Sequence, residues 1–140
     1  MSKIAIVFWS GTGNTEAMAE AVAEGVQTHG GEAALIPAAE FAPEQMDAYD
    51  AIAYGCPAMG DETLEEGEFE PMFEGCKPRL SGRRIALFGS YGWGDGEWMR
   101  SWEEGCREAG AELVCESVIC QQDPDGEAVA ACQALGAALV

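Results

Sequence analysis

The chain has 140 residues, about half of them apolar, and its 25 acidic and 7 basic residues give a net charge of −18. This length suits a single domain with one hydrophobic core, which we expect to span residues 1–140. The acidic balance argues against nucleic acid or an anionic membrane as a partner. The apolar runs near the N-terminus are too short for a signal peptide or a membrane helix, and we expect a cytoplasmic monomer.

Four elements are predicted in the first half of the chain: strands over Lys3–Trp9, Ala33–Pro37 and Ala51–Gly55, and a helix over Thr15–His29. The first and third strands are almost continuously apolar, which is typical of strands buried on both faces of a sheet. The helix carries Met18, Val22 and Val26 at intervals of four residues, and two glycines stop it.

The second half is predicted to hold three helices, over Glu68–Cys76, over Gly96–Ala109 and within residues 124–140. It is also predicted to hold a strand over Arg84–Gly89 and a last strand in two segments, Leu113–Cys115 and Val118–Cys120. Pro71 is expected to interrupt the first of these helices. Trp98, Trp102 and Cys106 fall on one stripe of the second, and Asp125 is the expected N-cap of the third.

Strands that alternate with helices predict a parallel sheet covered on both faces, and five such units in 140 residues predict a doubly wound α/β domain. The chain is too short for a closed eight-stranded barrel, which needs about 250 residues. Ligands of doubly wound sheets bind beyond the carboxyl ends of the strands. The loops after the first, third and fourth strands are therefore the candidate site: residues 10–15, 56–63 and 90–97.

The six cysteines form no Cys-x-x-Cys pair, and His29 is the single histidine. This pattern argues against a zinc site, and a disulfide framework is typical of secreted chains. We therefore expect reduced cysteines that pack as small apolar residues, and no metal. A lone histidine at a helix end also leaves no Ser-His-Asp set for nucleophilic catalysis.

The first of the three loops, Ser10 to Thr15, lies where a strand ends and a helix begins. Helix N-termini offer free N–H donors and partial positive charge, and the hydroxyl and amide side chains of this loop add further donors. We expect a phosphate group here, held without Lys or Arg. Glu16 stands where a Walker A loop needs its second Gly and the dinucleotide fingerprint its third, so neither an NTP nor a simple NAD site fits.

The other two loops offer room for a flat ring. Met59 presents a soft apolar face beside Gly60, and Trp93 stands between Gly92 and Gly94. A planar aromatic ligand stacked on Trp93 would cover an indole that is otherwise exposed on its loop. A phosphate at one end and a flat ring at the other indicate a mononucleotide with its own chemistry, FMN.

The stretches SGTGNTE, PAMGDE, EFEPMFE and ALFGSYGWGDGEWMR, in this order, resemble the short-chain flavodoxins of anaerobic bacteria over nearly the whole chain. The resemblance implies a five-stranded sheet in the order 2-1-3-4-5, one non-covalent FMN and electron transfer between low-potential redox proteins. It implies cofactor contacts from three groups of residues: Ser10, Gly11, Thr12, Gly13, Asn14 and Thr15; Ala58, Met59, Gly60, Asp61 and Glu62; and Ser90, Tyr91, Gly92, Trp93, Gly94 and Asp95. Gln122 falls where these flavodoxins often place an Asn beside the ring.

These residues indicate a low-potential one-electron carrier rather than an enzyme, cycling mainly between the flavin semiquinone and hydroquinone. The Gly60–Asp61 peptide is expected to turn its carbonyl toward the protonated ring nitrogen of the semiquinone, since glycine adopts the required backbone conformation at little cost in free energy. The surrounding acids and the phosphate oppose the second electron and lower its potential. The acidic run of residues 61–70 is expected to dock the basic faces of redox partners through salt-sensitive contacts.

Three other functions stay open on this fold. An FMN-dependent NAD(P)H:quinone reductase needs a substrate face and usually longer loops than these. A signalling receiver domain needs an Asp cluster at the strand ends, where this chain has Trp9-Ser10 and Gly55-Cys56. A structural FMN-binding module would show no reversible reduction of its flavin.

Overall fold

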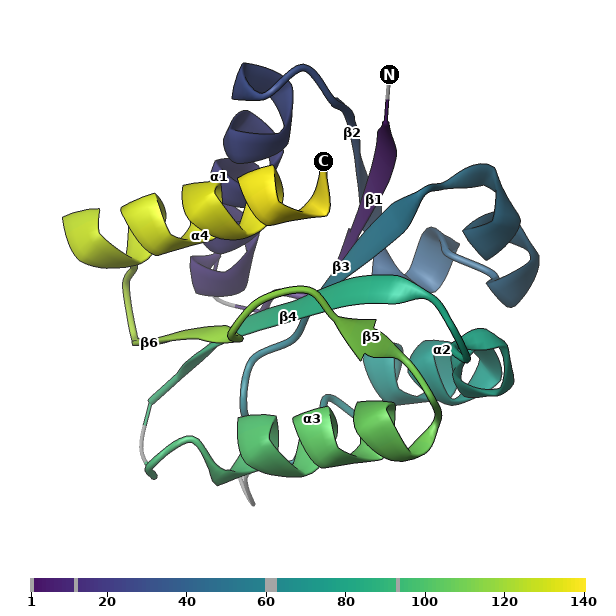
Figure 1. Cartoon of the computed structure of the whole chain (residues 1–140). Coiled ribbons are helices and arrows are strands. Elements are labelled where there is room, and N and C mark those ends of the chain that lie inside the picture. The colour runs from purple at the N-terminus through teal and green to yellow at the C-terminus, as the bar shows by residue number, and fades with distance from the viewer. Residues whose placement is uncertain (1, 12, 60–62, 93) are drawn as a thin grey trace.

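The structure, a computed structural model, describes residues 2–11, 13–59, 63–92 and 94–140. A parallel sheet forms its middle layer, with neighbouring strands in the order β2-β1-β3-β4-β5 and helices on both faces (Figure 1). The strands are β1 (Lys3–Phe8), β2 (Glu32–Pro37), β3 (Ala51–Gly55), β4 (Arg84–Tyr91), β5 (Glu112–Leu113) and β6 (Val118–Gln121). The helices are α1 (Asn14–Thr28), α2 (Phe69–Cys76), α3 (Glu97–Glu108) and α4 (Gly126–Leu139), with 3₁₀ turns at Ala38–Glu40, Pro43–Ala48 and Lys77–Arg79. This confirms the predicted doubly wound α/β fold.

The last strand of the sheet is split, as the sequence predicts. β5 pairs with the start of β4, where Glu112 lies opposite Arg84, and β6 pairs with its end, where Val118 lies opposite Phe88. Both ladders are parallel, so the carboxyl ends of β4 and β6 lie together. Residues that follow β6 therefore reach the same edge of the sheet as the loop that follows β4.

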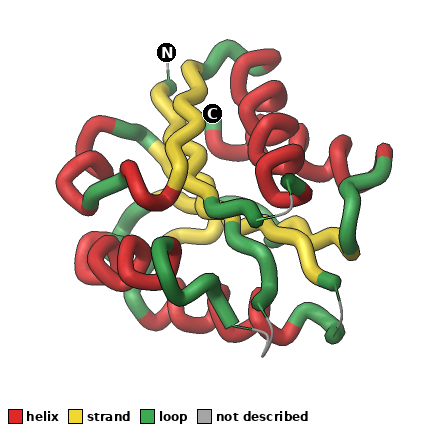
Figure 2. Tube along the Cα trace, turned by 180° about the vertical axis from the view of Figure 1, so that it is seen from behind, coloured by secondary structure: helices red, strands yellow, loops and turns green. Residues whose placement is uncertain are grey.

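Both faces of the sheet are buried, because alternate residues of each central strand enter different cores. Ile4 and Ile6 of β1 pack in the core beneath α1 and α4, whereas Ala5 and Val7 pack in the core beneath α2 and α3. Figure 2 shows these layers from behind, with the strands in yellow between the red helices.

The helices differ from the prediction at Pro71. α2 runs through Pro71, which is its third residue, so the expected interruption is wrong. The first N–H groups of a helix have no partner within the helix, and a proline in the first turn therefore removes no hydrogen bond. Trp98 and Trp102 of α3 are buried, and Asp125 Oδ1 accepts the Ala128 N–H at 2.8 Å at the start of α4, as predicted. No described helix is both long and apolar enough to cross a membrane.

The six cysteines are free thiols. Four of them are buried in the two cores: Cys56, Cys76, Cys106 and Cys132. Burial raises the pKa of Cys56, Cys106 and Cys132 to about 12, so these thiols stay protonated. This confirms that the buried cysteines pack as small apolar residues.

Candidate functional site

The loops after β1, β3 and β4 meet at the carboxyl ends of these strands, as the topology predicts. They enclose a cavity of about 330 Å³, within the range of about 300–1,000 Å³ that is usual for small-molecule sites. The lining residues come from these loops and from the residue after β6: Trp9, Gly11, Asn14, Thr15, Pro57, Ala58, Met59, Ser90, Tyr91, Gly92 and Gln122. None of these described lining residues is basic.

The first loop is organised around the hydroxyl of Ser10. Its Oγ accepts N–H bonds from Gly13 at 3.1 Å and from Glu16 at 3.3 Å, which curls the loop at the N-terminus of α1. Gly13 has a φ of 97°, which favours glycine, and a Cβ at Gly11 would lie 3.0 Å from the ring of Trp9. The backbone therefore needs both glycines to pass this close to the cavity.

Thr15 and Ser90 join the first loop to the end of β4. Thr15 Oγ1 and Ser90 Oγ lie 2.8 Å apart, and the two residues are 1% and 5% exposed. The backbone carbonyl of Ser90 also accepts the Ala58 N–H at 2.9 Å, which attaches the second loop to the same point. One residue of β4 thus holds both neighbouring loops.

The second loop is closed by backbone contacts around a buried thiol. The Met59 N–H donates to the Thr63 carbonyl at 2.9 Å, so the residues on either side of positions 60–62 are tied together. Cys56 Sγ accepts the Glu65 N–H at 3.4 Å. Because burial keeps the Cys56 thiol neutral, it supports this loop without adding a charge near the cavity.

The third loop follows Tyr91, the last residue of β4, whose ring centroid lies 5.5 Å from that of Trp98. Trp98 is buried, and its Nε1 donates to the Cys56 carbonyl at 3.2 Å. Gln122 lies beside this loop, with its N–H bonded to the Tyr91 carbonyl at 2.8 Å. Its φ of 59° is the one positive value among the described non-glycine residues.

The predicted contact residues fall into three groups. Eight of those predicted line the cavity: Gly11, Asn14, Thr15, Ala58, Met59, Ser90, Tyr91 and Gly92. Ser10 and Gly13 shape the first loop without lining the cavity, and Gly94 and Asp95 do not line it either. Asp95 instead pairs with Arg100 at 3.1 Å on the exposed surface. Five predicted residues lie outside the described part of the chain: Thr12, Gly60, Asp61, Glu62 and Trp93.

Two residues of the cavity wall, Trp9 and Pro57, are not among the contacts predicted from the sequence. Trp9 directly follows β1, and its Nε1 donates to Glu68 Oε1 at 2.9 Å, which ties the first loop to the start of α2. Their place in the sequence could have indicated them, because both residues follow the carboxyl end of a strand, where ligands of this fold bind. Gln122, whose role the sequence left undecided, also lines the cavity.

The acidic run beside the cavity is partly used within the chain. The carboxylate of Glu65 accepts the N–H groups of Gly67, Glu68 and Phe69 at 2.7–2.8 Å. Burial opposes its ionisation, but these three donors outweigh that effect and lower the pKa of Glu65. Glu66 and Glu70 remain exposed and are the described carboxylates of this run that have no side-chain bond to another described residue.

A doubly wound parallel sheet with a cavity at the carboxyl ends of its strands is typical of nucleotide-binding proteins. The family model described as Flavodoxin matches residues 6–135, and the chain belongs to the flavodoxin family. It is 48% identical over 120 residues to the flavodoxin of Clostridium beijerinckii, covering 86% of this chain and 87% of that relative. It is 39% identical over 135 residues to the flavodoxin of Megasphaera elsdenii, covering 96% of each. The solution structure of two-electron reduced Megasphaera elsdenii flavodoxin matches with a TM-score of 0.90 and 40% identity over 97% of each chain.

Flavodoxins are electron-transfer proteins, not enzymes, and their cofactor is FMN, which is therefore the cofactor of this chain. The described residues fit that group. Donors at the start of α1 suit a phosphate, and the side chains of Met59, Tyr91 and Trp9 supply apolar and aromatic surface for a ring.

Proposed function

We propose that this chain is a low-potential one-electron carrier that binds one FMN non-covalently in the cavity between the three loops and cycles mainly between semiquinone and hydroquinone. The observation that supports this best is a cavity lined by all three loops with no basic residue among its described lining residues. Such a site suits a ligand that is anionic at one end and flat at the other. FMN supplies the redox chemistry, and the chain binds and tunes it.

The phosphate end is assigned to residues 10–15. Ser10 Oγ fixes the curl of the loop, so that backbone donors at the start of α1 converge on one anion. The Asn14 amide and the Thr15 hydroxyl add side-chain donors, and Thr12 is assigned to the same set from the sequence. Fixed neutral donors bind the phosphate and leave most of its charge in place.

The ring end is assigned to the second and third loops. Ala58 and Met59 line the cavity from the second loop, and Tyr91, the last residue of β4, and Gly92 line it at the start of the third. From the sequence alone, further ring contacts are assigned to Gly60, Asp61, Glu62, Trp93, Gly94 and Asp95. The Gly60–Asp61 peptide is proposed to accept the hydrogen bond that stabilises the one-electron-reduced form.

The low potential follows from charge. The chain carries a net charge of −18, and the residues that the structure describes in the cavity wall include no cation to neutralise added electrons. At an effective dielectric near 20, each negative charge about 10 Å from the ring raises the free energy of a further electron by about 1–2 kcal/mol. Asp95 raises this free energy less than an unpaired carboxylate would, because Arg100 Nη2 lies 3.1 Å from its Oδ1.

The partners are proposed to be redox proteins that dock by basic faces on the acidic surface near residues 61–70. Exposed Glu66 and Glu70 are the described acids best suited to this contact, since Glu65 and Glu68 bond within the chain. Docking of this kind is weak and salt-sensitive, which suits a carrier that must leave its partner after each electron. The carrier is proposed to act as a monomer in the cytoplasm.

The assignment of a phosphate end and a ring end to the cavity is tested by titrating the apoprotein with FMN and, separately, with riboflavin. Riboflavin has the ring but no phosphate. Flavin fluorescence should be quenched at one FMN per chain, and riboflavin should bind at least about tenfold more weakly. Equal affinity for the two flavins would contradict a phosphate site at residues 10–15. NADH oxidation by the holoprotein alone would instead indicate a reductase.

A further inference from the structure

Trp9, a wall residue of the cofactor cavity, is held at both ends of its indole ring. Its backbone N–H donates to the Gly55 carbonyl at 3.0 Å, which fixes the residue at the ends of β1 and β3. The six-membered ring lies against the first loop, since Trp9 Cη2 would be 3.0 Å from a Cβ placed on Gly11. At the other end of the indole, Nε1 donates to Glu68 Oε1 at 2.9 Å. The indole thus connects the loop assigned to the phosphate with the start of α2.

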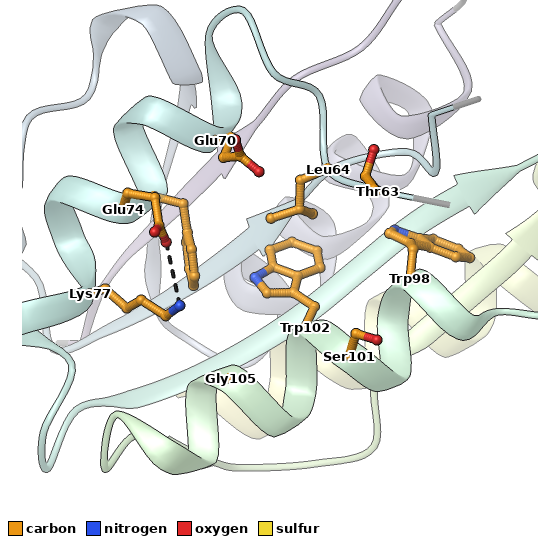
Figure 3. Close-up of a pocket in the computed structure, with 10 residues that line it drawn as sticks. Thr63, Leu64, Glu70, Glu74, Lys77, Trp98, Ser101, Trp102 and Gly105 are labelled. Atoms are coloured by element: carbon orange, nitrogen blue, oxygen red, sulfur yellow. Dashed lines mark ion pairs between the residues drawn. The ribbon is translucent and has the colours of Figure 1, made fainter. Parts of the chain in front are cut away.

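Glu68 lies on a rigid part of the chain. Its backbone N–H donates to Glu65 Oε1 at 2.7 Å. The next residue, Phe69, is buried and packs edge-on against Trp102, with ring centroids 5.4 Å apart. Figure 3 shows Trp102 projecting from α3 toward α2, with Leu64 above it in this view. The backbone at Glu68 is therefore fixed, and only its side chain loses conformational freedom when it bonds to Trp9.

The bond from Trp9 distinguishes Glu68 from the other acids of residues 61–70. Glu65 uses its carboxylate to accept N–H groups at the start of α2. Among the acids of this run that the structure describes, Glu68 is the one whose carboxylate bonds to a residue of the cavity wall. Glu68 itself does not line the cavity, so any effect of this bond on the cofactor passes through Trp9.

The charge of Glu68 and its hydrogen bond act on the cofactor in opposite directions. The FMN phosphate is anionic, so a carboxylate beside the cavity wall opposes binding by repulsion. The hydrogen bond favours binding, because it holds the ring on which the first loop packs at Gly11. An ionised acceptor also makes a stronger hydrogen bond than a neutral one. The two roles therefore predict opposite changes in affinity when the carboxylate is removed.

We propose that Glu68 is a positioning residue for the cofactor site: its carboxylate orients the Trp9 indole, and the indole holds the first loop in the conformation that binds the phosphate. This inference rests on the proposed assignment of the phosphate to residues 10–15. Glu68 is exposed and Trp9 is half-buried, so water competes for the bond. We therefore expect a severalfold effect on FMN affinity rather than a loss of binding.

The role is tested by titrating the parent apoprotein, Glu68→Gln and Glu68→Ala with FMN and following the quenching of flavin fluorescence. Glu68→Gln removes the charge but keeps an oxygen that accepts from the indole, whereas Glu68→Ala removes both. We expect the Ala variant to bind FMN at least about threefold more weakly than the Gln variant, and more weakly than the parent chain. Equal affinities of the two variants, or tighter binding by the Ala variant than by the parent chain, would overturn the inference.

A double-mutant cycle tests whether Glu68 acts through Trp9. Trp9→Phe keeps an aromatic ring at the wall but removes the N–H donor, so Glu68→Ala in this background should weaken FMN binding by less than about twofold. A loss as large as in the parent background would show that Glu68 acts by another route. Glu66→Ala is the matched control, because it removes a neighbouring exposed carboxylate that bonds to no other described side chain, and it should not weaken FMN binding.

The orientation of the indole is also read directly in the apoprotein. The Trp9 indole N–H is assigned in the ¹H–¹⁵N spectrum by its loss in Trp9→Phe. Its proton should move upfield further in Glu68→Ala than in Glu68→Gln, since a hydrogen bond to oxygen shifts a proton downfield. An unchanged signal in both variants would reject the bond and the role of Glu68 with it. Equal binding of FMN and riboflavin by the parent chain would instead reject the phosphate assignment itself.

Discussion

The hydroxyl oxygens of Thr15 and Ser90, 75 positions apart in the chain, lie 2.8 Å from each other in a buried contact. This contact joins the N-terminus of α1 to the end of β4, which are the two ends of the cavity. Together with the bond from the Ala58 N–H to the Ser90 carbonyl, it holds the first and second loops at the end of β4.

Replacing Thr15 by Val keeps the shape of the side chain but removes its hydroxyl. The Ser90 hydroxyl then loses its buried partner, so we expect the apoprotein to lose about 1–3 kcal/mol of unfolding free energy, measured by urea denaturation. FMN should also bind more weakly in a fluorescence titration. Thr28→Val, the same change at an exposed position of α1, is the control and should be nearly neutral. Equal stability of the two variants would show that the contact contributes nothing.

Gln122 is strained by its positive φ of 59°. Left-handed backbone costs most residues about 1–2 kcal/mol, whereas Gly and Asn adopt it more readily. Gln122→Gly and Gln122→Asn should therefore raise the midpoint of thermal unfolding, and Gln122→Val should lower it. A higher midpoint for the Val variant would contradict the assigned conformation. The Asn variant also tests, through its FMN affinity, whether a shorter amide at this wall position is tolerated.

Glu65 predicts a pH dependence of stability. The three amide donors lower the pKa of its carboxyl in the folded chain below the ordinary value of 4.5. A lowered folded-state pKa contributes stability that is fully present above the unfolded-state pKa and is lost as the pH falls through the folded-state pKa. Glu65→Gln should therefore lower the unfolding temperature at pH 7, and the difference from the parent chain should shrink below pH 4.5.

The neighbouring carboxylate provides the control variant. Glu66 is exposed and accepts no side-chain bond from another described residue, so Glu66→Gln removes one negative charge without breaking a described contact and should change the unfolding temperature little at pH 7. A difference between the Glu65 variant and the parent chain that stays constant from pH 7 to pH 3 would mean that its charge does not stabilise α2.

The sequence predicts the regular elements well where burial is strong. β3 has its predicted bounds, Ala51–Gly55, because a short run buried on both faces has no other place in the fold. The 3₁₀ turns at Ala38–Glu40 and Pro43–Ala48 were not predicted, since they carry too few residues to show a hydrophobic period. Pro71 was misread because its effect depends on its place in the helix, which the sequence alone leaves uncertain.

The site was predictable as a set of loops, because the parallel topology brings the carboxyl ends of β1, β3 and β4 together. Individual wall residues were harder to predict. Trp9 lies at the cavity because it follows β1, but its indole is bonded to Glu68, 59 positions away, and such pairings carry no local sequence signal. The conformation of Gln122 depends in the same way on a bond to the Tyr91 carbonyl.

The central claim is that this chain carries single electrons on FMN. It is tested most directly by stepwise anaerobic reduction of the FMN-loaded protein, followed in the visible spectrum. The proposal predicts a yellow oxidised form that converts to a blue neutral semiquinone near one electron per flavin and then bleaches at a distinctly lower potential. A direct two-electron conversion from yellow to colourless, with no long-wavelength absorption at any stage, would contradict it.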